Sequence, residues 1–184
     1  MNLPVSTLLA HRLYLGNDSD ANDLALLNAL RVRFCLSVDG GPSTVACMVL
    51  KGREPTLEDV QEAFAEIDAR IDAGEAVLIF SEQGLARGAM IAAAYLMHAM
   101  ALPLDVALGY VSARRMMVDL TLDLMGWLVA NEHALVGARS RGGLNVPLEF
   151  LTSADQFAVN RVWYKMGRTP PPLPLVRCNA GIFE

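Results

Sequence analysis

The clearest apolar pattern along the chain is helical. Between residues 57 and 71, apolar side chains recur every three or four positions, which predicts an amphipathic helix. Thr56 and Asp59 have the spacing of a capping box at its start, and Gly74 is placed to end it. Asp20 or Asn22 is the expected cap of an earlier helix. Similar patterns predict helices over residues 20–30, 88–100, 103–114 and 120–135.

Short apolar runs between these helices predict β-strands. The expected strands cover residues 13–16, 32–38, 44–50 and 77–80. The last of these runs has no alternation of apolar and polar residues, which is typical of a central strand covered on both faces. Strands that alternate with helices, followed by a run of helices, predict an α/β domain with a mostly parallel central sheet flanked by helices.

The chain changes character near residue 139. Residues 1–138 hold all the predicted elements, whereas residues 139–184 form an extension with a proline-rich stretch that favours polyproline II structure. We expect this C-terminal extension to act as a docking tail. Its expected contacts are the side chains of Trp163, Tyr164, Pro171, Pro172 and Phe183.

Composition limits the classes of function. The net charge of −5 gives no electrostatic reason to expect nucleic acid, so any contact with RNA would be only local. The 3 cysteines lack paired spacing, which fits a reducing intracellular compartment, cytoplasm or mitochondrion, and neither a disulfide framework nor a zinc site. No apolar run reaches the roughly 20 residues that span a membrane. We therefore expect no metal, no cofactor and no membrane insertion. The apolar content of 53% favours cover by partner proteins.

Candidate chemistry follows the expected central strand. Ser81, Gly84 and Arg87 lie between the strand 77–80 and the helix 88–100. A strand, a tight turn and a helix N-terminus in this order present backbone N–H groups to an anion, and Arg87 can add a forked guanidinium. A serine nucleophile elbow is not favoured, because it requires glycine at positions 79 and 83.

Longer stretches of the chain resemble one family. They are "LYLGNDSDANDLALLNALRVRFCLSV", "QEAFAEIDARIDAGEAVLIF", "ARGAMIAAAYLMHAMALPLDVALGYVSARR" and "DLMGWL". In this order they resemble the dual-specificity phosphatases of the protein tyrosine phosphatase superfamily, from about Leu8 to Leu135. The resemblance implies the fold of that family, a mostly parallel sheet flanked by helices.

The resemblance also implies a phosphate-binding loop that has lost its chemistry. The family's loop reads His-Cys-x-x-Gly-x-x-Arg-Ser/Thr, with the cysteine as nucleophile and the arginine as a phosphate ligand. Here Phe80 and Ser81 replace the histidine and the cysteine, and Gly88 replaces the final hydroxyl residue. A serine hydroxyl is too weakly acidic to attack without an adjacent base. We therefore expect no catalytic residue, and a vestigial phosphate site at Gly84 and Arg87.

Acidic and basic residues near this loop also bear on its expected function. The family's general acid is an aspartate that should fall within residues 45–55, where the only acid is Glu54. Glu82 lies inside the loop, and its carboxylate would repel a phosphate dianion. We expect Glu82 to pair with Arg87 or with loop N–H groups, as an internal substitute for the anion. Arg114 and Arg115 match an arginine pair of the family, for which we expect a structural role.

The sequence leaves three functions open. The first is a catalytically inactive phosphatase-like protein that acts as an interaction or architectural subunit of a stable protein assembly. A ribonucleoprotein such as an organellar ribosome would be one home for it. The second is an inactive protein that binds phosphoproteins through Arg87. The third is an active phosphatase with an engineered cysteine-to-serine change at Ser81, which the further changes at Phe80 and Gly88 do not favour.

Overall fold

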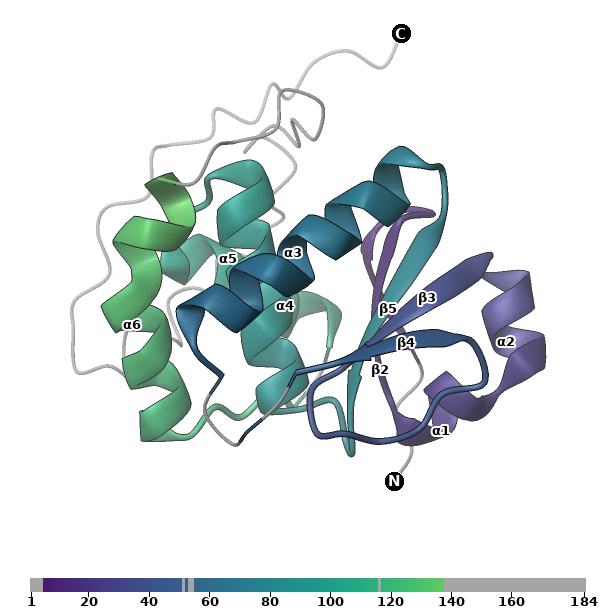
Figure 1. Ribbon diagram of the computed structural model, residues 1–184. Helices are drawn as coiled ribbons and strands as arrows, with labels where there is room; N and C mark the ends of the chain where they lie inside the picture. Colours follow the sequence, from purple (N-terminus) through teal and green to yellow (C-terminus); the bar gives the residue numbers. More distant parts are fainter. Residues whose placement is uncertain (1–4, 51, 53–54, 116, 138–184) are drawn as a thin grey trace, which may run out of the picture.

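The computed structural model describes residues 5–50, 52, 55–115 and 117–137, and these residues fold around one sheet (Figure 1). Strand β1 (Ser6–Leu9) pairs antiparallel with β2 (Leu13–Asn17), and the other neighbouring strands pair parallel. Across the sheet, the strands lie in the order β1, β2, β5 (Ala76–Ser81), β3 (Val32–Ser37) and β4 (Ala46–Val49). The prediction of a mostly parallel sheet is confirmed, and β1 is an edge strand that the apolar pattern did not predict.

Helices cover both faces of this sheet. The larger layer contains α3 (Leu57–Asp72), α4 (Arg87–Met100), α5 (Leu104–Arg114) and α6 (Leu122–Gly137). The smaller layer contains α1 (Asp18–Asn22) and α2 (Leu24–Ala29). Val77 and Ile79 of β5 pack into the larger layer, and Leu78 and Phe80 pack into the smaller one. Because both faces of β5 are covered, its apolar run has no polar alternation.

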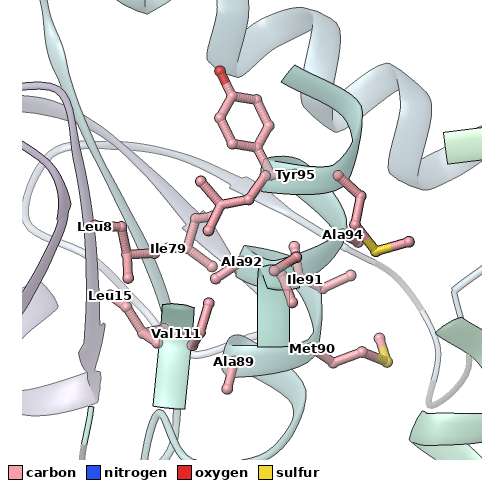
Figure 2. Packing of buried hydrophobic residues seen from close by; sticks show 14 of the residues in the cluster. Leu8, Leu15, Ile79, Ala89, Met90, Ile91, Ala92, Ala94, Tyr95 and Val111 are labelled. Atoms are coloured by element: carbon pink, nitrogen blue, oxygen red, sulfur yellow. The ribbon is translucent and has the colours of Figure 1, made fainter. Parts of the chain in front are cut away.

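Helix α4 lies at the centre of the larger layer, where it contacts β5 and β2 of the sheet and the helices α5 and α6. Every residue from Gly88 to Met97 is buried, which is why this helix shows no polar face in the sequence. In Figure 2, Ala92 lies beside Ile79 of the sheet, and Ala89 is a further small buried residue of the same helix. Small residues at these positions let the helix approach the strands closely, and α4 therefore has a fixed position at the end of β5.

The cap of α3 follows the sequence pattern. The Thr56 side chain accepts a hydrogen bond from the Asp59 N–H at 3.1 Å, and the Asp59 carboxylate accepts one from the Thr56 N–H. Gly74 follows the end of this helix with a φ of 80°, a conformation that suits glycine. The predicted capping box and helix end are confirmed.

The predicted single helix over residues 20–30 is wrong in detail, because the chain forms α1 and α2 instead. Asn17 caps α1, in place of the expected Asp20 or Asn22. The Asp23 side chain then accepts a hydrogen bond from the Leu26 N–H at 2.9 Å and starts α2. A short aspartate side chain competes with the helical hydrogen bonds of its own backbone, which explains the break.

The predicted extension, residues 139–184, lies outside the described residues. The same holds for its predicted contact residues, which remain predictions: Trp163, Tyr164, Pro171, Pro172 and Phe183. Within the described part of the chain, none of the helices has the length and apolar character needed to cross a membrane. Among the same residues, no group of histidine, cysteine, aspartate and glutamate is arranged to hold a metal ion.

Candidate functional site

The candidate loop lies at the carboxyl edge of the parallel strands, where ligand sites of α/β sheets commonly form. Strand β5 ends at Ser81 and helix α4 begins at Arg87. In the sheet register, Ser37 of β3 lies opposite Phe80 of β5. The chain that leaves β3 therefore runs beside the loop and brings Asp39 to Glu82, 43 residues away in sequence.

Ser81, at the nucleophile position, is 3% exposed and serves as a hydrogen-bond acceptor. Its Oγ accepts hydrogen bonds from the N–H groups of Gly84 at 3.1 Å and Gly88 at 3.2 Å. Among the described residues, no carboxylate or imidazole contacts this hydroxyl. A hydroxyl held in this way closes the turn, and none of the described residues is placed to remove its proton.

Gly88 and Ser81 are fitted to each other. A Cβ atom added to Gly88 would lie 2.8 Å from the Ser81 Oγ and 3.3 Å from Leu15. Any side chain at position 88 would therefore push against the hydroxyl and against β2. The replacement of the family's hydroxyl residue by Gly88 and the packing around Ser81 are thus linked.

Arg115 fixes the shape of the loop from behind. This side chain is 1% exposed and donates hydrogen bonds from Nε to the Gly84 carbonyl at 2.7 Å and from Nη2 to the Gln83 carbonyl at 3.0 Å. Its Nη1 also donates to the Leu15 carbonyl of β2 at 3.3 Å. Because C=O and N–H point in opposite directions across a trans peptide bond, carbonyls held toward Arg115 turn the following N–H groups away from it. The structural role expected for this arginine takes the form of support for the loop.

Burial affects the charges behind the loop. Desolvation lowers the pKa of Arg115, and the nearby Asp20 carboxylate acts in the opposite direction. Burial likewise raises the pKa of Asp20, while its hydrogen bond from the Asn17 N–H and the charge of Arg115 lower it. An arginine remains charged under these conditions, so Arg115 keeps a full set of donors for the loop carbonyls.

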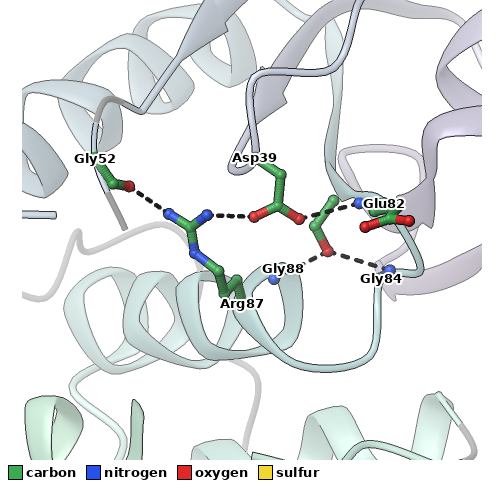
Figure 3. Close-up of polar contacts among 7 residues, drawn as sticks. Asp39, Gly52, Glu82, Gly84, Arg87 and Gly88 are labelled. Carbon is green, nitrogen blue, oxygen red and sulfur yellow. Dashed lines mark hydrogen bonds and ion pairs between the residues drawn. The ribbon is translucent and has the colours of Figure 1, made fainter. Parts of the chain in front are cut away.

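Arg87, the residue expected to bind phosphate, is already paired (Figure 3). Its Nη1 donates to Oδ1 of Asp39, and its Nη2 donates to the Gly52 carbonyl at 2.6 Å. The other carboxylate oxygen of Asp39, Oδ2, accepts a hydrogen bond from the Glu82 N–H at 3.1 Å. The Asp39 carboxylate therefore bridges the arginine and a backbone N–H group of the loop.

The expectation that Glu82 supplies the internal anion is wrong. Glu82 is exposed and contributes its backbone N–H, while the carboxylate on Arg87 belongs to Asp39. The reason is the sheet register, which places Asp39 rather than the Glu82 side chain opposite the guanidinium. The sequence signal for Asp39 was an aspartate directly after a parallel strand, at the edge where ligand sites form.

The structure separates Phe80 from the other predicted residues of the loop. Phe80 is fully buried in the smaller core, where it packs with Leu78 and Tyr14 and offers no hydrogen bond to the loop. Ser81, Gly84, Arg87 and Gly88 are brought together around one turn, as their spacing suggested. Glu54, the acid nearest to the expected general-acid position, lies outside the described residues.

Solved structures of other proteins share this fold. Human DUSP28 is 26% identical to this chain with a TM-score of 0.66, and the match covers 73% of this chain and 97% of that one. A mouse dual specificity phosphatase complexed with zinc tungstate is 24% identical with a TM-score of 0.65, covering 73% of this chain and 89% of the other. The second likeness concerns the fold alone.

Sequence comparison identifies the family. Human dual specificity protein phosphatase 2 is 30% identical over 129 residues, which are 65% of this chain and 41% of that relative. The chain thus spans less than half the length of that protein. The family model "Dual specificity phosphatase, catalytic domain" matches residues 13–134, which is more than half of the chain. The chain therefore belongs to the dual specificity phosphatase family.

Proposed function

We propose that this chain is a catalytically inactive phosphatase-like protein that works by binding other proteins in a stable assembly. The observation that carries the proposal is the state of Ser81. Its hydroxyl accepts two N–H bonds inside the turn and contacts no base among the described residues. Phosphoryl transfer through a covalent intermediate needs an activated nucleophile, and an unassisted serine does not provide one.

The pairing of Arg87 gives independent support. In the alternative function, Arg87 binds the phosphate of a phosphoprotein. A phosphate dianion would then meet the negative charge of Asp39, which already occupies the guanidinium and one loop N–H. Two negative charges that share one guanidinium repel each other, and this repulsion weakens the binding of phosphate. The pairing of Arg87 therefore counts against recognition of phosphate by this loop.

Helix α6 offers a surface for a protein partner. Leu122 is 86% exposed and Val129 is 37% exposed, and their spacing of seven residues places them on the same side of the helix. Gly126, which lies between them, is exposed as well. Among the described residues of α6, Leu122 and Val129 are the exposed large apolar side chains that a partner protein would cover. A protein assembly, including a ribonucleoprotein, fits this surface better than free RNA does, because the chain carries a net charge of −5.

The catalytic part of the proposal is tested by restoring the nucleophile. Ser81→Cys should leave turnover of a small aryl phosphate at background, because Phe80 and Gly88 still lack the family's hydrogen-bonding groups. The double variant Ser81→Cys, Arg87→Met is the matched control. Turnover that appears with Ser81→Cys and disappears with the double variant would instead support an active phosphatase with an engineered serine.

The binding part is tested with the tagged full chain purified from its own cells. We expect it to elute from a size-exclusion column in a large complex, and Leu122→Glu or Val129→Glu to release it as a monomer. Leu24→Glu is the control, because Leu24 is 53% exposed but lies on α2, across the sheet from α6. A wild-type chain that elutes only as a monomer would count against the assembly.

A further inference from the structure

We propose that Asp39 is an internal ligand of the loop, and that its carboxylate decides which anions the loop accepts. The inference rests on the proposed function in one respect, since it explains why a retained arginine need not mean phosphate binding. It concerns a residue outside the loop, which arrives from the end of β3.

The contacts of Asp39 match those of a bound oxyanion. Backbone N–H groups and a guanidinium are the donors that such a loop offers to an anion. Asp39 takes one donor of each kind, the Glu82 N–H with Oδ2 and the Arg87 Nη1 with Oδ1 (Figure 3). The two oxygens of the Asp39 carboxylate therefore occupy the donors that two oxygens of an external anion would need.

The loop still has unused hydrogen-bond donors among the described residues. The Nε of Arg87 is buried and has no hydrogen-bond partner among the described residues. The backbone N–H groups of Leu85 and Ala86 likewise have no acceptor in the described part of the chain. The Arg115 contact with the Gly84 carbonyl turns the Leu85 N–H away from Arg115. The Asp39 carboxylate thus satisfies only part of the donor set.

The ion pair between Asp39 and Arg87 is partly shielded from water. The side chains of Arg87 and Asp39 are 21% and 29% exposed, so their attraction is only partly screened by water. An oxyanion that approaches must either displace Asp39 or accept a neighbouring negative charge. Without the charge at position 39, Arg87 would keep its Nη2 contact with the Gly52 carbonyl. Its Nε and Nη1 donors could then bind a ligand. The negative charge of Asp39 therefore keeps anions out of the loop, while Arg115 and Gly84 maintain the shape of the loop.

The test compares the affinity for inorganic phosphate of purified full-length variants at constant ionic strength. Asp39→Asn keeps the size of the side chain and an acceptor for the Glu82 N–H, but it removes the charge. We expect it to bind phosphate at least tenfold more tightly than the wild type does. Glu82→Gln is the matched control, because it removes a neighbouring exposed carboxylate that does not touch Arg87. It should change the affinity by less than about threefold, as expected of a screened charge.

A second variant identifies where phosphate binds. Adding Arg87→Met to Asp39→Asn should abolish the gain, and amide NMR shifts in the single variant should include Leu85 and Ala86. Equal gains from Asp39→Asn and Glu82→Gln would overturn the proposal, and so would unchanged affinity in a folded Asp39→Asn protein. Circular dichroism and the unfolding midpoint confirm that each variant is folded.

The outcomes separate this inference from the proposed function. If Asp39→Asn fails to bind phosphate, the charge of Asp39 does not keep anions out of the loop, but the lack of a nucleophile at Ser81 is unaffected. If Ser81→Cys turns over an aryl phosphate, the proposed function fails, while the affinity comparison keeps its meaning. Asp39→Asn alone is expected to show no turnover, because it adds no nucleophile.

Discussion

At the scale of single residues, Gly84 depends most directly on having no side chain. Its φ is +66°, and an added Cβ would lie 2.2 Å from the Gly16 carbonyl oxygen and 2.6 Å from Nη2 of Arg115. Neither neighbour can move easily, since one is backbone of β2 and the other is a buried guanidinium. The retained glycine therefore has a structural reason that does not require phosphate.

We expect Gly84→Ala to lower the free energy of unfolding by about 3 kcal/mol, since it adds a clash to backbone strain at positive φ. Gly126→Ala is the control within α6, where an added Cβ meets nothing within 4 Å. It should stabilise the protein by about 0.5–1 kcal/mol, because alanine is the better helix former. Urea unfolding of both variants measures the difference, and similar effects from the two would contradict the geometry described for the loop.

At the scale of elements, Arg115 joins parts of the fold that are far apart in sequence. It follows α5 directly and donates to carbonyls in the loop before α4 and to Leu15 in β2. Arg114, the preceding residue, lies instead over the ring of Tyr110 at 3.3 Å. Arg115 is thus the arginine of the pair that is buried behind the loop, while Arg114 is partly exposed and also donates to the Tyr110 carbonyl at 3.2 Å.

Arg115→Met should lower the free energy of unfolding by about 3–5 kcal/mol, because the buried Gly84 carbonyl and the partly buried Gln83 carbonyl lose their donors. Arg114→Met should cost less, about 1–2 kcal/mol, because Arg114 is only partly buried and water can replace its ring and carbonyl contacts with Tyr110. Chemical denaturation of the two variants provides the measurement. A loss for Arg114→Met as large as that for Arg115→Met would show that Arg115 does not hold the loop.

At the scale of the whole molecule, the sheet is covered on both faces, and this makes Cys35 a probe of global stability. Cys35 is fully buried between β3 and the smaller helical layer. Burial is the main cause that raises the pKa of its thiol from 9.0 to about 11. The unfolded chain therefore releases this proton at a lower pH than the folded chain does, and stability must fall as the pH rises from about 9 to about 11.

The expected loss is about 2 kcal/mol between pH 8 and pH 10.5, from the two-unit difference in pKa. It should appear as a difference between the wild type and Cys35→Ala, whose pH dependence lacks this thiol. Unfolding free energies of both proteins at the two pH values give the result. Profiles that run parallel from pH 8 to pH 10.5 would mean that Cys35 ionises equally easily in the folded chain.

The sequence by itself determined the features that depend on neighbouring residues. The capping box at Thr56 and the covered strand β5 follow from patterns within a few positions, and both are present as expected. The departures at Phe80, Ser81 and Gly88 are likewise visible in the sequence alone. Local hydrogen bonds and side-chain periodicity suffice for such features, because their partners lie within one or two turns of the chain.

Only the tertiary structure decided which charge meets Arg87. Glu82 was the nearer carboxylate in sequence, yet Asp39, 48 residues before Arg87, makes the ion pair. The contact of Arg115 with Leu15 spans 100 residues. Both contacts depend on how β2, β5 and β3 pair, and a difference of one residue in that register would turn the side chains to the other face. The residues that define the loop's chemistry are therefore visible in the local sequence. The pairing of the strands decides that Asp39 binds Arg87 and that Arg115 supports the loop.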